Sequence, residues 1–414
     1  MLERLVPAGV FLGLLATGVA AQDVPEPAPQ TALSASYSFT GQDGKDDPAW
    51  SAAQTATVGL TGRWGQGLKL EGRLTAPFDN SALTGDGLVK QLTLTWDVTP
   101  WSVVTFGKQR LLWGTARVFS AIDSLQPSSD PVHPNAVLDG VTGVRLDLIP
   151  NEWLSASVLA LPATLLADSK IATRIDVLWD DTDLSVGAIR SVTQALTGWD
   201  GSTPTAQKRP HGAFFADVSR FFDRFGLYGE VEVKTFRDQD WYGSNGTLPV
   251  SGSSGADPVW TSKATAGLQV DFPAWLKGTI SWLTEYHYNG SGFDAGEAVP
   301  FAQAWKQRYP LDHPTNFAPP AGLTVGTFSR HYGFTGLSGI PVTEKLNLGV
   351  SALGGLDTGF VLGRLTADYT VDQKLSVNFT YSRFDHLPGT DADAGDLAFL
   401  GMKDQVSLTV TGTY

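Results

Sequence analysis

The sequence alternates apolar and polar residues in one segment after another. In residues 54–64, Val58 and Leu60 share a face that is opposite to Thr57 and Thr61. The same period of two recurs at 68–74, 88–98, 144–148, 174–179, 230–234, 264–271, 278–285, 361–369 and 375–382. Successive side chains of a β-strand point to opposite faces, so these segments are predicted to be strands with one apolar face. Helical periodicity is hard to find.

Short and long connections alternate between these segments. Short turns are expected at 65–67, 99–101, 150–152, 180–183, 273–274 and 372–373, and longer links at 41–53, 111–138, 193–209, 237–258, 288–326 and 385–403. Outer-membrane barrels have short periplasmic turns and long extracellular loops. The pattern predicts an all-β fold, a transmembrane antiparallel β-barrel of about 18 strands, with 16 as the alternative. The rival fold is a soluble β-sandwich, whose strands also alternate.

Aromatic residues cluster at the short turns. An indole ring is apolar but carries one N–H donor, which suits the boundary between lipid and water. The residues within one or two positions of these turns are Trp64, Trp96, Trp101, Trp153, Trp179, Phe272 and Trp275. In a sandwich these rings should instead be scattered through the core face.

The last ten residues, 405–414, alternate without a break and stop on an aromatic residue. Val406, Leu408, Val410 and Tyr414 fall on one face. This ending resembles the C-terminal signal by which the outer-membrane assembly machinery recognises barrel proteins. The resemblance implies that the terminus is built into the sheet and that this machinery is a partner during biogenesis.

The N-terminus carries the one long apolar run, from Leu5 to Ala21, which follows Arg4 and ends in small residues. This pattern predicts a signal peptide over residues 1–21, with a retained anchor helix as the alternative. A Pro-rich leader is expected over 22–31 and the barrel over 32–414. The expected location is the outer membrane of a Gram-negative-type bacterium.

Charge and cysteine content exclude several classes of function. The net charge is −13 at pH 7, which argues against binding nucleic acid through a basic surface. The chain has no cysteine, so disulfides and thiolate metal sites are excluded. The expected surroundings are outer-membrane lipid and lipopolysaccharide, and a homo-oligomer is compatible with the sequence.

If the apolar faces meet lipid, the charged faces line a water-filled lumen. The pore-lining candidates are Lys69, Glu71, Arg73, Asp97, Arg145, Asp147, Arg174, Asp176, Glu230, Glu232, Lys234, Asp271, Lys277, Glu285, His287, Arg364 and Asp368. Seven of them are basic and nine are acidic, which predicts a weak cation preference. The alternative role for each charge is structural, because opposite charges can pair across strands and stiffen the wall.

The most distinctive stretch covers residues 107–127. It contains Gly107-Lys108-Gln109-Arg110, then Trp113-Gly114, and an Asp before Leu125-Gln126-Pro127. It resembles a motif seen in several porin-like outer-membrane families, where this region often folds toward the barrel wall or lumen. The resemblance makes Arg110, Arg117 and Asp123 candidate constriction residues. The alternative is that Arg110 and Asp123 form an ion pair that only anchors the loop.

The longest loop, 288–326, contributes two further constriction candidates, Lys306 and Arg308. Long loops without secondary structure tend to be functional or disordered. An inward fold would narrow the pore, whereas an outward fold would make a cell-surface lid. We expect at least one of the two long loops to fold inward.

Catalytic constellations and cofactor motifs are absent from the sequence. No HExxH, GxSxG, GxGxxG or phosphate loop occurs. Glu285 and His287 share a strand face, which could form a proton-transfer or metal pair but more often forms a lumen hydrogen bond. We therefore expect no enzyme and no cofactor, but a porin-type channel for passive diffusion of small polar solutes. A non-conducting surface barrel that binds a polysaccharide, a protein or a hydrophobic ligand is the alternative, and a barrel enzyme is the third.

Overall fold

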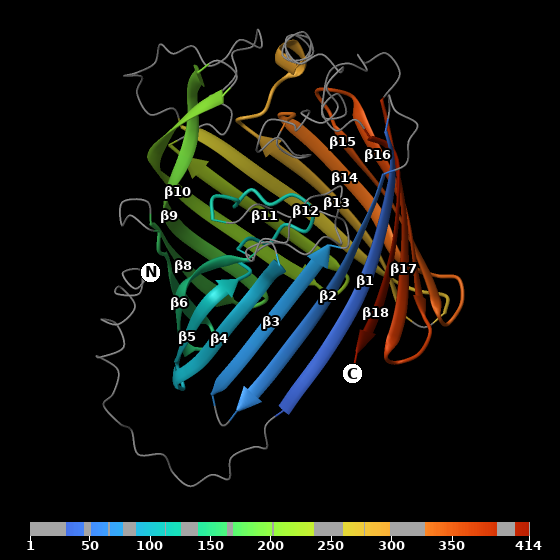
Figure 1. The fold of residues 1–414 in the computed structure, drawn as a ribbon, viewed down its shortest axis with the longest axis horizontal. Helices are drawn as coiled ribbons and strands as arrows, with labels where there is room; N and C mark the ends of the chain where they lie inside the picture. The colour runs from blue at the N-terminus through green and yellow to red at the C-terminus, as the bar shows by residue number, and fades with distance from the viewer. Residues whose placement is uncertain are drawn as a thin grey trace.

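The computed structural model describes residues 30–44, 51–64, 67–77, 88–111, 113–125, 140–163, 169–200, 203–235, 260–276, 278–298, 328–386 and 402–413. They form 18 strands (Figure 1): β1 (Gln30–Gly44), β2 (Ser51–Trp64), β3 (Leu68–Pro77), β4 (Val89–Thr99), β5 (Ser102–Gln109), β6 (Val141–Asn151), β7 (Leu154–Leu161), β8 (Lys170–Trp179), β9 (Thr182–Asp200), β10 (Thr203–Phe222), β11 (Phe225–Lys234), β12 (Thr261–Pro273), β13 (Thr279–Asn289), β14 (His331–Pro341), β15 (Leu346–Gly355), β16 (Phe360–Thr370), β17 (Leu375–His386) and β18 (Met402–Thr413). The predicted number of strands is confirmed.

The sheet closes on itself. Each strand pairs antiparallel with its neighbours in the sequence, and β18 pairs with β1 from Ser34–Thr413 to Gly44–Met402. Closure removes both sheet edges, so every spanning strand finds backbone partners on both sides. The structure therefore confirms an antiparallel barrel and builds the C-terminal strand into its wall. No helix in the described part of the chain has the length and apolarity needed to cross a bilayer.

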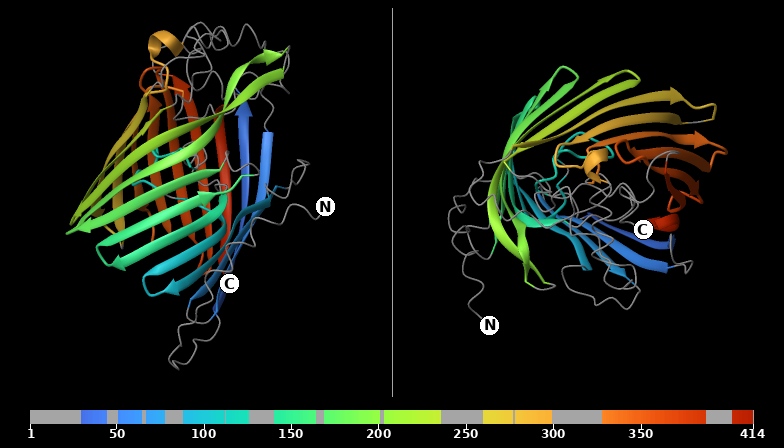
Figure 2. Two further views of the ribbon diagram at one scale, coloured as in Figure 1. Left: turned by 90° about the vertical axis from the view of Figure 1, so that its left-hand side faces the viewer. Right: turned by 90° about the horizontal axis from the view of Figure 1, so that it is seen from above.

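The short turns all lie at one end of the barrel, where β1 begins and β18 ends (Figure 1). The predicted turns are confirmed, and two more, at 223–224 and 342–345, complete the set. One predicted long link is wrong. Residues 193–209 are not a loop, because β9 and β10 continue to Asp200 and from Thr203 as a hairpin that projects beyond the rim (Figure 2). At the same end, β15 and β16 are joined by only 356–359.

The outer face of the barrel is apolar and exposed. Leu94 is 40% exposed, and similar exposure of large apolar side chains recurs on strands around the barrel. The predicted aromatic residues near the short turns are all exposed, namely Trp64, Trp96, Trp101, Trp153, Trp179, Phe272 and Trp275, and Phe221, Phe222 and Phe225 join them at the 223–224 turn. A closed sheet with this exterior needs hydrocarbon around it and an interfacial girdle at its rim. The chain is therefore an outer-membrane β-barrel, with the short turns on the periplasmic side.

The inner face follows from strand register, because residues paired directly across strands share a face of the sheet. Starting from Glu230 on β11, the pairs lead through Asp217 to Ser185 in one direction, and through Thr265 to His287 in the other. Along this row of β9 to β13, polar side chains thus face the lumen, as the alternation predicted. Positions 1–29 and 414, which include the predicted signal peptide and Tyr414, lie outside the described residues.

Candidate functional site in the lumen

The segment 113–125 lies inside the barrel. It follows Gln109 at the end of β5 and contacts β11, β12 and β13 on another part of the wall, where it is visible as the teal loop in front of these strands (Figure 1). Polar contacts to wall carboxylates hold the middle of this segment, and apolar contacts hold both of its ends. We call residues 113–125 the docked loop.

Glu230 forms the first anchor of the docked loop. Its carboxylate accepts hydrogen bonds from the backbone N–H groups of Thr115 at 2.9 Å and Ala116 at 3.1 Å, and also from that of Ala121. The residue is only 4% exposed. A buried carboxylate is costly unless its oxygens are hydrogen-bonded, and here successive peptide groups of the loop satisfy them.

Glu285 forms the second anchor. Its carboxylate accepts from the backbone N–H groups of Arg117 at 2.5 Å, Val118 at 3.0 Å and Phe119 at 3.0 Å. The Tyr228 hydroxyl donates to the same carboxylate at 2.5 Å. Consecutive N–H groups that converge on one anion form a concave binding site for it. In this case the anion belongs to the wall and the concave site belongs to the loop.

Gly114 permits the close approach to Glu230. Its φ is +111°, a backbone conformation that L side chains rarely adopt. A Cβ at this position would lie 2.3 Å from Glu230 Oε2. The Trp-Gly pair of the 107–127 stretch therefore has a structural reason, since glycine allows both the turn and the contact.

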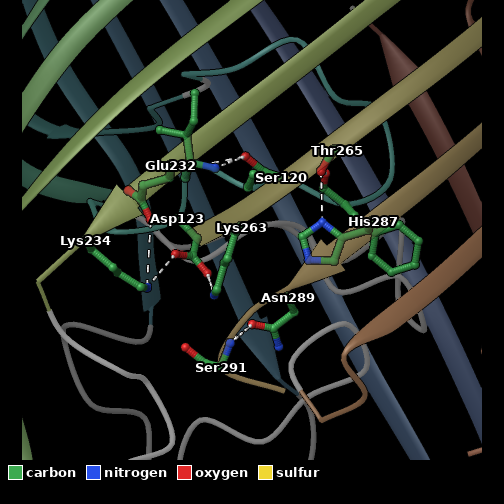
Figure 3. Close-up of polar contacts among 12 residues, drawn as sticks. Ser120, Asp123, Glu232, Lys234, Lys263, Thr265, His287, Asn289 and Ser291 are labelled. Carbon is green, nitrogen blue, oxygen red and sulfur yellow. Dashed lines mark hydrogen bonds and ion pairs between the residues drawn. The ribbon is translucent and has the colours of Figure 1, made fainter. Parts of the chain in front are cut away.

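Asp123 lies between two lysines of the wall (Figure 3). Its carboxylate is 2.6 Å from Lys263 Nζ on β12 and 3.5 Å from Lys234 Nζ on β11. Glu232 lies 3.8 Å from Lys234. Two acids and two bases thus form a balanced group, and both lysines and Glu232 are buried. Asp123 was predicted either to form the constriction or to pair with Arg110; the structure gives it lysine partners from other strands.

Apolar contacts hold both ends of the docked loop. Trp113 near its start and Ile122 and Leu125 near its end pack with Leu111 and with the inner-face residues Leu159, Leu161, Ala172, Ile189, Ala213 and Phe215 of β7 to β10. In its middle, Phe119 joins Tyr332, Leu353, Phe360, Leu362 and Phe384 on β14 to β17. The loop is therefore packed along the wall from β7 to β17, and this contact removes a large apolar area from the lumen.

Glu285 and His287 do not form an exposed pair. Glu285 is occupied by the loop, and His287 Nδ1 is 2.8 Å from Thr265 Oγ1. The Phe119 ring stacks on the imidazole with ring centroids 5.3 Å apart, and Thr265 also donates to the Phe119 carbonyl at 2.9 Å. These contacts assign both residues to the docking of the loop. Among the described residues, no group of three His, Asp or Glu side chains could hold a metal ion.

Three arginines on or near the docked loop differ in how far they are exposed. Arg117 is exposed, whereas Arg73 and Arg110 are half-buried. Burial lowers the pKa of the Arg110 guanidinium, and the nearby positive charge of Arg73 lowers this pKa further. A guanidinium nevertheless stays protonated in proteins, so these side chains keep their charge. Arg73 and Arg110 lie where the chain leaves β5, whereas Arg117 lies in the middle of the loop, next to Glu285 on β13.

Most other pore-lining candidates pair along their own strand, and Arg174 also pairs with Asp217 on β10 at 3.5 Å. Lys69 and Glu71 are 2.6 Å apart, Arg145 and Asp147 are 2.8 Å apart, and Arg174 and Asp176 are 2.5 Å apart. Three other candidates form hydrogen bonds with uncharged side chains on neighbouring strands: Asp271 with Ser281, Arg364 with Ser382, and Asp368 with Asn378. Asp97 also faces inward, opposite Val103. Lys277, Lys306 and Arg308 lie outside the described residues.

The sequence reasoning missed Tyr228 and Lys263. Both lie on inner faces in line with residues that had been identified, since Lys263 precedes Thr265 by two positions and Tyr228 precedes Glu230 by two. Extending each alternating segment by one more pair would have found them.

Comparison with known proteins shows the fold. No protein-family model matches the chain, and no curated protein is significantly similar to it. The solved structures that share the fold include OccAB1 of Acinetobacter baumannii at 12% identity and a TM-score of 0.52, OccK3 (OpdO) of Pseudomonas aeruginosa at 14% and 0.53, and Wzi of Escherichia coli at 13% and 0.54. The matches cover 93%, 94% and 92% of this chain and 96%, 96% and 83% of the other chains, respectively. This chain therefore has a porin-like outer-membrane fold.

Proposed function

We propose that the protein is a passive channel for small polar solutes across the outer membrane. The observation that carries the proposal is the docked loop, which lies along the inner wall on two carboxylate anchors and presents Arg117 to solvent inside a closed barrel. A hydrated lumen lets a polar solute cross the membrane without entering hydrocarbon. A loop held at a fixed depth sets the pore diameter and the electric field that the solute meets. No covalent chemistry is required.

A weak cation preference is the finer part of this proposal. It rests on the small excess of acids over bases among the lumen candidates. The structure limits its size, because the carboxylates of Glu230, Glu285 and Asp123 are already bound to loop N–H groups or to lysines. The remaining field comes from the paired charges, from Arg73, Arg110 and Arg117, and from the inner-face charges that hydrogen-bond to uncharged side chains, namely Asp271, Asp368 and Arg364. We therefore expect the permeability for cations to exceed that for anions only slightly.

Conductance in planar bilayers tests both parts. The purified barrel should give stepwise potassium chloride conductance, and a salt gradient should give a reversal potential slightly on the cation-selective side. A correctly folded barrel that never conducts would refute the channel, whereas a clear anion preference would refute only the selectivity.

A carbohydrate-binding surface barrel is the second candidate. Wzi is described as a carbohydrate-binding β-barrel involved in capsule assembly, and this chain shares its fold at a TM-score of 0.54. Saturable binding of a polysaccharide by a barrel that carries no ion current would favour this function over the channel.

We propose three kinds of partner from the outer surface. Three outward-facing basic side chains suit the phosphates of lipopolysaccharide, namely Lys108 and Arg383 near the extracellular ends of β5 and β17, and Arg190 midway along β9. The outward-facing Val406, Leu408 and Val410 on β18 suit recognition by the assembly machinery before closure. A homo-oligomer would have to bury part of the same apolar exterior.

A further inference from the structure

The lumen has two chemically different sides. On the side of β10 to β12, Asp217, Glu230, Glu232, Lys234 and Lys263 face inward, and each is at most 4% exposed. The docked loop contacts three of these five residues directly. The most densely charged part of the wall is therefore removed from the water through which a solute would move.

The other side of the lumen is lined by hydroxyl groups. Ser376, Thr411, Ser36, Thr57 and Thr75 are paired directly from strand to strand, so one row of hydroxyls crosses β17, β18, β1, β2 and β3. Thr57 and Thr75 hydrogen-bond through their hydroxyls at 2.9 Å. Except for Thr75, these side chains are exposed or half-buried.

A second row lies beside the first. It consists of Asn378, Thr409, Ser38 and Thr55, and Thr409 donates to Ser38 at 3.2 Å. From Gln405 to Thr411 and from Ser34 to Ser38, the described inner faces of β18 and β1 carry no charged side chain. We call the two rows together the hydroxyl band.

A hydroxyl side chain can both donate and accept, and it can rotate to suit its partner. Adjacent hydroxyls in cross-strand pairs can exchange hydrogen bonds with neighbouring hydroxyls of a polyol, because both groups play either role. A charged solute gains less here, since an uncharged hydroxyl offsets its lost hydration only in part. An ether oxygen can accept a hydrogen bond but cannot donate one. Ether solutes can therefore use the hydroxyls of the band only as donors and not as acceptors.

We propose that the hydroxyl band makes this channel favour neutral polyhydroxylated solutes, such as sugar alcohols and small saccharides, over neutral solutes of equal size with few hydroxyls. The inference rests on the proposed channel function and specifies the solute class. The band acts as a run of weak, exchangeable partners, which suits passage because no single contact holds the solute for long.

Swelling of liposomes that contain the full-length barrel tests the inference. The probes are xylitol, with a hydroxyl on every carbon, and triethylene glycol, a solute of similar size with mostly ether oxygens. We expect the wild-type protein to admit xylitol faster. The variant Thr57→Val/Thr409→Val, which removes one hydroxyl from each row at nearly constant shape, should lower the xylitol-to-glycol rate ratio by about two- to tenfold.

Matched variants separate the possible explanations. Thr142→Val/Thr173→Val removes two exposed hydroxyls from the outer face and should leave the ratio unchanged. Thr57→Ser/Thr409→Ser keeps the inner hydroxyls and should retain the wild-type ratio. A wild-type ratio set by size alone, or equal ratios in the inner and outer valine variants, would overturn the inference while potassium chloride conductance still supports the channel. Failure of the proposed channel itself would instead appear as no conductance and no uptake of either probe.

Discussion

Glu230 and Glu285 face the lumen from β11 and β13, two strands apart, and bind successive peptide groups of the same loop. Glu230 accepts hydrogen bonds from the N–H groups of residues 115 and 116, and Glu285 accepts them from those of residues 117 to 119. The loop thus crosses from one anchor to the other without a free peptide donor between them. This arrangement holds the loop in a fixed position against the wall, so in the proposed channel it would act as a fixed constriction rather than as a freely moving gate.

Replacing both anchors should release the docked loop. In Glu230→Gln/Glu285→Gln, each amide loses the negative charge and turns one donor toward the loop N–H groups. Hydrogen bonds to charged groups contribute roughly 1.5–3 kcal/mol each, so the docked state should lose several kcal/mol. Single-channel recordings should show a changed mean conductance and more current noise. The control is Glu71→Gln, which removes an acid of the lumen that pairs with Lys69 and does not touch the loop. Recordings identical to wild type would contradict the anchoring role.

Gly114→Ala should disturb the same loop from its own side. The added Cβ would meet Glu230 Oε2, and the positive φ adds a strain of about 1–3 kcal/mol. We expect a shifted conductance, measured in planar bilayers, with little change in the thermal unfolding of the barrel wall. Gly363→Ala provides a matched control on the outer face, because no atom lies within 4 Å of the added Cβ. Equal effects of the two substitutions would contradict the steric argument.

The sequence predicts the barrel well because lipid acts on every strand in the same way. Side chains alternate between hydrocarbon and water, so the polarity of Leu94 and Thr95 is enough to predict which face of the sheet each residue lies on. That constraint ends where the wall leaves the membrane. The hairpin of β9 and β10 continues beyond the rim, and its residues 193–209, which lack a clear alternation, read as a loop.

The docked loop was predictable only in outline. Its anchors on Glu285 are backbone N–H groups, which every residue except proline carries and which therefore leave no sequence signal. The glutamates were identified as facing the lumen, but their partners depend on where a distant segment lies. Likewise, the partners of Asp123 come from β11 and β12, more than a hundred residues away, and sequence proximity alone could suggest only the nearer Arg110 as an alternative partner.

Asp123→Asn should shift selectivity toward anions. The substitution leaves Lys234 and Lys263 buried with Glu232 as the remaining acid of the group, which adds one net positive charge beside the loop. Removing one partner of a buried pair also destabilises a protein by roughly 3–5 kcal/mol, so the loop should loosen as well. Reversal potentials in a potassium chloride gradient measure the shift. The companion variant Asp123→Asn/Lys263→Gln restores the charge balance and should return the potential toward the wild-type value. A shift toward cations in the single variant would contradict this charge assignment.

A lysine on each side of one strand tests which face meets lipid. Leu94→Lys places a charge on the exposed apolar face of β4, where hydrocarbon would surround it, and should destabilise the folded barrel by roughly 2–4 kcal/mol near mid-membrane. Thr95→Lys places the same charge in the lumen, next to the Lys69–Glu71 pair, and should cost much less because water reaches it. Urea titrations of folding into lipid vesicles, followed by tryptophan fluorescence, compare the two variants. Greater destabilisation by Thr95→Lys than by Leu94→Lys would mean that the apolar face packs against protein and that the barrel does not span a membrane in this orientation.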